Sequence, residues 1–183
     1  EAEYRKRAAD LVAQMTLHEK VSQMLSWAPA IERLGIPAYN WWSEGIHGVG
    51  RAGTATVFPQ AIGMAAAFDE DMMEQVGNAV GVEARGKYNM CRAHGDRDIF
   101  KGLTVWAPNI NIFRDPRWGR GHETYGEDPF LTSRLGVRFV EGMQGDDTSD
   151  ILTSAKADGF NSDLQRYLTD KSISVADAIS RAF

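Results

Sequence analysis

Short apolar runs alternate with longer segments of helical periodicity along this chain of 183 residues. Residues 36–42 and 103–112 form two such runs, and each is followed by a loop and then by a helical segment. The first helical segment covers residues 71–88, and the second begins at Pro129. This order is typical of a parallel sheet with crossover helices. We therefore predict an α/β fold in which the two runs are parallel neighbours, with helix 71–88 as a right-handed crossover.

Capping residues mark where several of these helices begin. Residues 4–15 have apolar side chains at helical spacing. Thr16 follows, with Glu19 three residues later, which is the pattern of a capping box. We expect that second helix to continue through Leu25. Asp69 is placed to cap the long helix of residues 71–88.

Composition excludes several classes of function. The net charge of −5 gives no basic surface for nucleic acid. The single cysteine, Cys91, rules out an internal disulfide and a cysteine-based zinc site. No run of about 18 apolar residues occurs, so we expect no membrane-spanning helix and no membrane partner.

A loop at residues 114–128 is dense in chemistry. It follows the second apolar run and contains arginines, carboxylates, a histidine, a tryptophan and a tyrosine. Loops at the ends of strands often carry function, because a rigid scaffold positions them. Arginines can donate paired hydrogen bonds to a polyhydroxylated ligand, and an aromatic ring can cover its apolar face. An arginine–carboxylate network that only fixes the loop would have the same composition.

A second loop, at residues 41–51, follows the first apolar run. Its sequence, WWSEGIHGVGR, combines two tryptophans with a carboxylate, a histidine and an arginine. Loops at the carboxyl ends of parallel strands face the same side of a barrel, so the two loops are expected to form one site. For His47, a hydrogen bond to the backbone is a simpler role than catalysis.

Several long motifs in these segments resemble glycoside hydrolase family 3. They cover residues 1–147 in the order of that family's N-terminal barrel domain. The matching pieces are MTLHEKVSQM, RLGIPAYNWWSEGIHGV, ATVFPQAIGMAAAFD, VGVEARG, VWAPNINIFRDPRWGRGHETYGEDP and VEGMQGDD. WWSEGIHG is most similar to β-xylosidases, since β-glucosidases usually have aspartate at the position of Glu44. The resemblance implies a fold of the (β/α)8-barrel type, partial in this chain.

The resemblance also implies a set of sugar-binding residues. Glu44 matches the carboxylate that hydrogen-bonds the terminal sugar, and Arg120 matches the arginine that grips the same sugar. Arg51 and Trp42 are further substrate-binding candidates. Three carboxylates are expected to support the loop structurally. These are Asp115, Glu123 and Asp128.

The tail, residues 148–183, departs from the family pattern. It has no Lys-His pair, and its end is similar to the helices that close the family's barrel, as though the middle were missing. Asp163, in GFNSDL, is the candidate nucleophile if that segment is a remnant of the nucleophile motif. Alternatively, ADGFNSDL aligns with a later segment before the closing helices, which we favour. No segment matches the domain that supplies the acid/base in most relatives.

Two functions remain open at this point. The resemblance implies hydrolysis of terminal β-linked xylosides or glucosides with retention, for which two carboxyl groups lie roughly 5 Å apart. The alternative is a non-catalytic sugar-binding or interaction module. Neither requires a metal or cofactor. The expected partners are a glycoside or oligosaccharide, together with a second copy of the chain or a missing barrel portion, and the family favours secretion or a periplasmic location.

Overall fold

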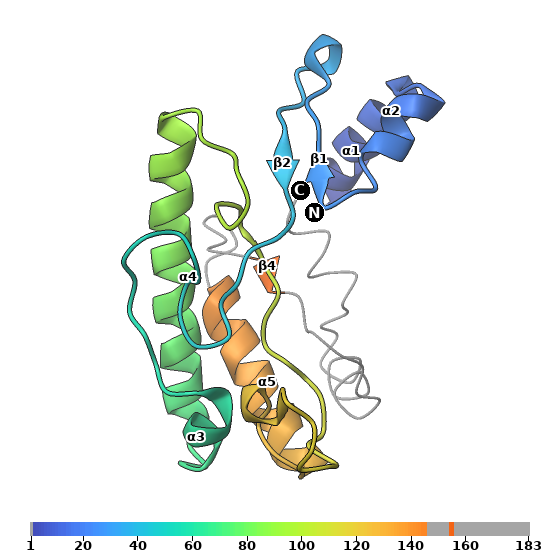
Figure 1. Ribbon diagram of the computed structural model, residues 1–183. Coiled ribbons are helices and arrows are strands. Elements are labelled where there is room, and N and C mark those ends of the chain that lie inside the picture. The colour runs from blue at the N-terminus through green and yellow to red at the C-terminus, as the bar shows by residue number, and fades with distance from the viewer. Residues whose placement is uncertain (1, 146–153, 156–183) are drawn as a thin grey trace.

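A computed structural model describes residues 2–145 and 154–155 of the chain (Figure 1). The helices are α1 (Ala2–Gln14), α2 (Leu17–Ser22), α3 (Ala61–Ala65), α4 (Glu70–Ala93) and α5 (Pro129–Gln144), with short 3-10 turns η1 (Glu32–Leu34) and η2 (Gly121–Glu123). The strands are β1 (Trp27–Ala28), β2 (Tyr39–Asn40), β3 (Thr104–Val105) and β4 (Ser154–Ala155). None of the described helices is both long enough and apolar enough to cross a membrane.

The predicted capping residues begin their helices as expected. Thr16 and Glu19 form a complete capping box, in which each side chain hydrogen-bonds the other residue's backbone N–H. Asp69 accepts a hydrogen bond from the backbone of Met72 at the start of α4. Asp128, which was expected only to support the loop at residues 114–128, does the same for Leu131 in α5, which has Pro129 in its first turn. The caps at Thr16 and Asp69 are local in sequence, which is why the pattern could predict them.

The prediction that the second helix continues through Leu25 is wrong. Helix α2 ends at Ser22, and Gln23 turns away to donate a hydrogen bond to the carbonyl oxygen of Pro29. Met24 and Leu25 are 83% and 66% exposed. A short helix gains most of its stability from tertiary packing, and exposed side chains provide none.

The strands are much shorter than the apolar runs that predicted them. Only two residues of run 36–42 form β2, and this strand pairs antiparallel with β1. Run 103–112 contributes only the two residues of β3 to a ladder. Pro37 and Pro108 lie within the two runs, and proline lacks the N–H that a ladder requires.

The two runs do not share a sheet, since β2 pairs with β1 and β3 with β4, and a single bridge with the predicted parallel sense connects them. Ser43, just beyond the first run, forms a parallel bridge with Val105 of β3. The amide of Trp106 donates to the carbonyl oxygen of Ser43 at 2.9 Å. Helix α4 lies between them in the chain, and β4 continues the parallel order on β3.

Helices α4 and α5 lie side by side and form the body of the structure (Figure 1). Two glycines allow their backbones to approach closely. A Cβ atom added at Gly77 would collide with the carbonyl oxygen of Phe139, and one added at Gly142 would collide with that of Glu74. The interface therefore tolerates no side chain at these two positions.

Ion pairs join the same two helices at their surface. Arg134 binds both carboxylate oxygens of Glu70, at 2.8 and 2.7 Å. Arg138, one turn further along α5, pairs with Glu74 and with Asp71. These pairs add charged contacts to the interface in which Gly77 and Gly142 lie.

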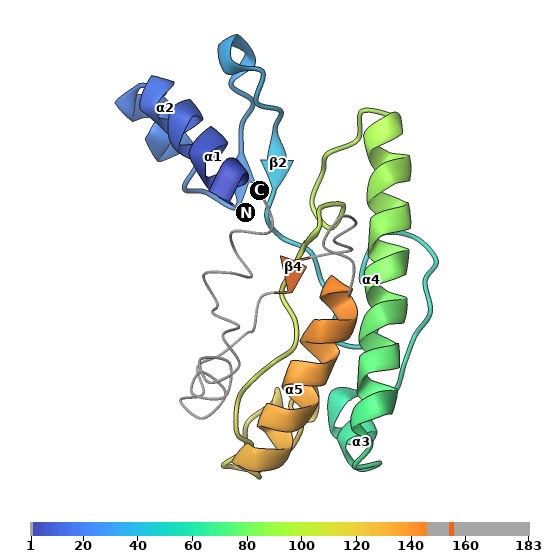
Figure 2. The ribbon, with the colours of Figure 1, turned by 180° about the vertical axis from the view of Figure 1, so that it is seen from behind.

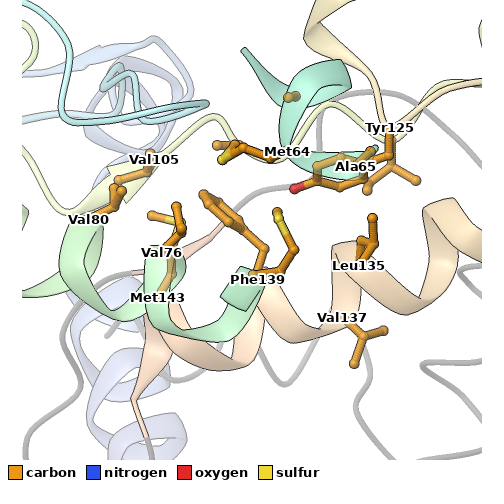
Figure 3. Close-up of a cluster of buried hydrophobic side chains, with 14 residues drawn as sticks. Met64, Ala65, Val76, Val80, Val105, Tyr125, Leu135, Val137, Phe139 and Met143 are labelled. Atoms are coloured by element: carbon orange, nitrogen blue, oxygen red, sulfur yellow. The ribbon is translucent and has the colours of Figure 1, made fainter. Parts of the chain in front are cut away.

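The hydrophobic core fills the space between this helix pair and the segment around β3 (Figure 3). Phe139, Leu135 and Met143 from α5 and Met73 from α4 are fully buried. Burying each such side chain stabilises the fold by about 1.5–3 kcal/mol. Val105 of β3 belongs to this cluster, so the core holds in place the strand that Ser43 of the first loop bridges and that precedes the second loop.

Candidate functional site

Trp42 and Glu44 form a hydrogen-bonded pair just after β2. The indole Nε1 of Trp42 donates to Oε1 of Glu44 at 3.0 Å. The indole ring stacks on Trp106, with centroids 5.3 Å apart and an angle of 28° between the planes. Trp42 is 41% exposed, so part of its surface remains open to a ligand beside the carboxylate.

The loop that follows Glu44 folds back against it. The amide of Gly50 donates to the carbonyl oxygen of Glu44 at 3.0 Å. Arg51, at a left-handed φ of 57°, lies with its guanidinium carbon 5.3 Å from the centre of the Phe100 ring. His47 Nδ1 lies 2.9 Å from the carbonyl oxygen of Phe58, which matches the backbone hydrogen bond expected for it. Glu44 and Arg51 thus belong to one closed loop.

Arg120 is paired with Glu123 in the second loop. Its Nε donates to Oε2 of Glu123 at 2.7 Å, and Asn109 donates to the same oxygen at 3.3 Å. Burial opposes ionisation of Glu123, but the hydrogen bond and the charge of Arg120 outweigh it, so the pKa of Glu123 lies below its ordinary value. The Arg120 side chain is 53% exposed, which leaves it accessible to solvent.

The other two carboxylates of this loop have local partners. Asp115 accepts hydrogen bonds from the backbone and the guanidinium of Arg117. Asp128 caps α5. Asp163, the candidate nucleophile, lies outside the described residues. Within residues 2–145 and 154–155, no cluster of three or more His, Cys, Asp and Glu residues could hold a metal ion.

Both loops are attached to the same short segment, residues 105–109. Ser43 and Trp42 contact its beginning, at Val105 and Trp106. Glu123 contacts its end, at Asn109. Val105 and Asn109 are 2% and 1% exposed, so this segment is a buried base for both loops.

Sequence reasoning missed two residues that organise the site. Trp106 supplies the ring under Trp42, and Asn109 joins Glu123 to the buried base. Both lie within run 103–112. An aromatic and an amide side chain near the end of a predicted strand could have indicated a role in the site. We assigned that run to a buried strand, which gave these side chains no function.

A family model described as "Glycosyl hydrolase family 3 N terminal domain" matches residues 8–158. This match covers most of the chain, including both loops. The chain belongs to this family. Membership accounts for the order β2, α4, β3, α5, β4, because the described residues form part of a (β/α)8-barrel-type fold.

Relatives in family 3 include several xylosidases. The chain is 52% identical over 151 residues to "Probable beta-D-xylosidase 7" of Arabidopsis thaliana, covering 77% of this chain and 19% of the relative. It is 50% identical over 143 residues to "Xylan 1,4-beta-xylosidase" of Xylanibacter ruminicola, covering 77% and 17%. The chain thus spans about a fifth of the length of these relatives.

Solved structures of family 3 enzymes share the fold. One is a GH3 exo-beta-xylosidase in complex with a xylobiose aziridine probe, with a TM-score of 0.76 and 37% identity over 86% of this chain and 20% of that one. Another is the GH3 beta-glucosidase of Bifidobacterium adolescentis, with a TM-score of 0.62 and 28% identity over 80% of this chain and 20% of that one.

Proposed function

We propose that this chain supplies part of the sugar-binding subsite of a retaining glycoside hydrolase that removes terminal β-linked xylose or glucose. Glu44, Trp42, Arg51 and Arg120 are the residues we assign to the sugar. The single observation that carries the proposal is the exposed Trp42–Glu44 pair, which combines an apolar ring face with a carboxylate acceptor. This combination suits a sugar, which has both apolar faces and hydroxyl donors.

Xylose is the sugar we favour. Glutamate at position 44 reaches further than aspartate and would crowd the space beyond C5, where glucose has a hydroxymethyl group and xylose has none. The named relatives with the highest identity quoted above are xylosidases, which is consistent with this choice. We further propose that the protein works outside the cytoplasm, since its substrates would be polysaccharide fragments.

A non-catalytic sugar-binding module is the alternative function. The described residues contain the proposed sugar-binding residues, but retention also requires a nucleophile and an acid/base. The cavity directly beside Glu44 has a volume of about 10 Å³, room for about one water, so a sugar would lie on the open side near Trp42. A module of this kind would bind sugar without turnover.

Arg120→Ala tests the proposal by calorimetry with methyl β-D-xylopyranoside. Removing the guanidinium should weaken binding by about 1.5–3 kcal/mol, as expected for the loss of a hydrogen bond to a charged group. Arg117→Ala is the matched control, because Arg117 lies in the same loop and pairs with Asp115. Equal affinity of the wild type and Arg120→Ala would contradict the assignment of Arg120.

A further inference from the structure

Two residues of α4 bind the segment that continues the loop at residues 41–51 beyond Arg51, which is called loop 51–56 below. Lys87 Nζ donates to the carbonyl oxygens of Ala52 and Thr54, at 2.9 and 2.5 Å. Glu83 accepts from the backbone N–H of Thr56 at 3.0 Å and from its hydroxyl at 2.5 Å. Both views of the molecule show the later part of the segment between β2 and α3 running along α4 on the side away from α5 (Figure 1, Figure 2).

Glu83 and Lys87 act from the same face of the helix. Residues four apart on a helix are neighbours, and this order of charges is the favourable one. The hydrogen bonds from Thr56 and the charge of Lys87 keep the pKa of Glu83 below its ordinary value, against the opposing effect of burial. One helical turn thus binds the loop with a cation at its carbonyl groups and an anion at its N–H and hydroxyl.

The anchoring residue Lys87 lies beside the candidate site residue Glu44. Lys87, Glu44 and Phe100 line one small cavity. Phe100 lies under the guanidinium of Arg51, and its backbone N–H donates to the carbonyl oxygen of Trp42 at 2.8 Å. A displacement of the loop from Lys87 would therefore move Arg51 relative to Glu44.

The loop backbone needs such external support. Arg51 has a φ of 57°, a conformation that residues other than glycine adopt only when their surroundings impose it. Gly48, at φ 132°, lies so close to the carbonyl oxygen of Thr56 that an added Cβ would collide with it. Residues 48–56 thus combine this close internal approach with support from outside the loop, where Glu83 and Lys87 supply four hydrogen bonds.

We propose that Lys87 and Glu83 are positioning residues, which hold loop 51–56 so that Arg51 and Glu44 present one sugar-binding surface. The effect on sugar binding rests on the proposed function, whereas the anchoring of the loop does not. Neither residue is assigned to the ligand. Each acts through the loop it holds.

The experiment uses the 183-residue chain with two independent measurements. Hydrogen exchange of the amides of residues 52–56 reports whether the loop is held, and titration with methyl β-D-xylopyranoside reports sugar affinity. Lys87→Met removes the donors while keeping most of the stem. We expect exchange about tenfold faster and affinity about three- to tenfold weaker, as for the loss of one or two hydrogen bonds.

Conservative replacement separates positioning from general loss of structure. Lys87→Arg restores cationic donors and should return both measurements towards wild type. Thr56→Val, which removes only the hydroxyl that binds Glu83, should change both in the direction of Lys87→Met even if the latter fails to fold. Lys6→Met, on α1, removes the same charge elsewhere and should change neither.

Each contrary outcome identifies a different error. Unchanged exchange in both Lys87→Met and Thr56→Val would refute the anchor. Faster exchange with unchanged affinity would refute the positioning role. A wild-type chain that binds no xyloside would refute the proposed function and with it the positioning role, whatever the exchange rates.

Discussion

Two arginines of the loop at residues 114–128 form ion pairs with carboxylates only two or three residues away in the chain. Arg117 pairs with Asp115, and Arg120 pairs with Glu123. Pairs this local and this exposed are weakly held, since solvent screens them. A guanidinium has five donor hydrogens, so one arginine can take part in the loop's network and also be a candidate donor to a sugar hydroxyl. The structural network and the binding function are therefore compatible in one residue.

The same pairing chemistry predicts a titration at Glu19 of α2. A hydrogen bond from Arg33, with further bonds from Thr16, lowers the pKa of Glu19 to about 2 from an ordinary 4.5. Because the pKa in the folded state is depressed, the stability it contributes is present above pH 4.5 and is lost as the pH falls towards 2. Arg33→Met should raise the pKa of Glu19 towards 4.5 and remove this loss, as measured by NMR titration of its side-chain carbon. A pKa that stays near 2 in the variant would show that Arg33 is not the cause.

Helix α4 serves two purposes on opposite sides. One side packs through Gly77 against α5, and the other holds loop 51–56 through Glu83 and Lys87. Packing against α5 restrains α4 along its length. The hydrogen bonds that Glu83 and Lys87 make from its other side therefore start from fixed positions. The position of loop 51–56 therefore depends on how α4 and α5 pack.

A pair of glycine substitutions tests this packing. Gly142→Ala places a methyl group against the backbone of Glu74 and should destabilise the fold by about 1–3 kcal/mol, the usual cost of overpacking. Gly86→Ala is the matched control, because Gly86 lies in α4 with nothing within 4 Å of an added Cβ. It should stabilise the fold by about 0.5–1 kcal/mol through helix propensity. Denaturant unfolding measures both, and a neutral Gly142→Ala would contradict the close approach of the helices.

The whole chain spans about a fifth of the length of the relatives it matches. The described residues include the residues proposed to bind the sugar, within part of a barrel-type fold. Retaining hydrolysis requires two carboxyl groups across the anomeric carbon, and Glu44 is already assigned to the sugar hydroxyls. We therefore expect this chain to bind sugar without the turnover of a complete retaining enzyme.

We expect the 183-residue chain to hydrolyse aryl β-xylosides or β-glucosides very poorly or not at all. Loss of a catalytic nucleophile removes most of the rate and leaves what binding supplies. The measurement is release of nitrophenol, with and without azide or formate, since a small anion can replace a missing carboxylate. Turnover at ordinary enzyme rates that Asp163→Ala abolishes would identify Asp163 as the nucleophile and overturn our preferred alignment of the tail.

The sequence by itself indicated the longer helices and two of the residues that cap them. Thr16 and Asp69 cap their helices through hydrogen bonds that span three residues, so the pattern contains the whole interaction. It also determined the family, because the motifs around Glu44 and Arg120 are long and occur in the family's order.

Only the tertiary structure decided how much of each apolar run became a strand and which residues support the site. The stacking of Trp42 on Trp106 joins residues 64 positions apart in the chain, and the bonds from Lys87 to the loop span more than thirty. Such contacts depend on the packing of α4 and α5 around the core, and no local pattern contains that geometry. The residues proposed to bind the sugar were therefore named from the sequence, whereas the residues that contact and support them were not.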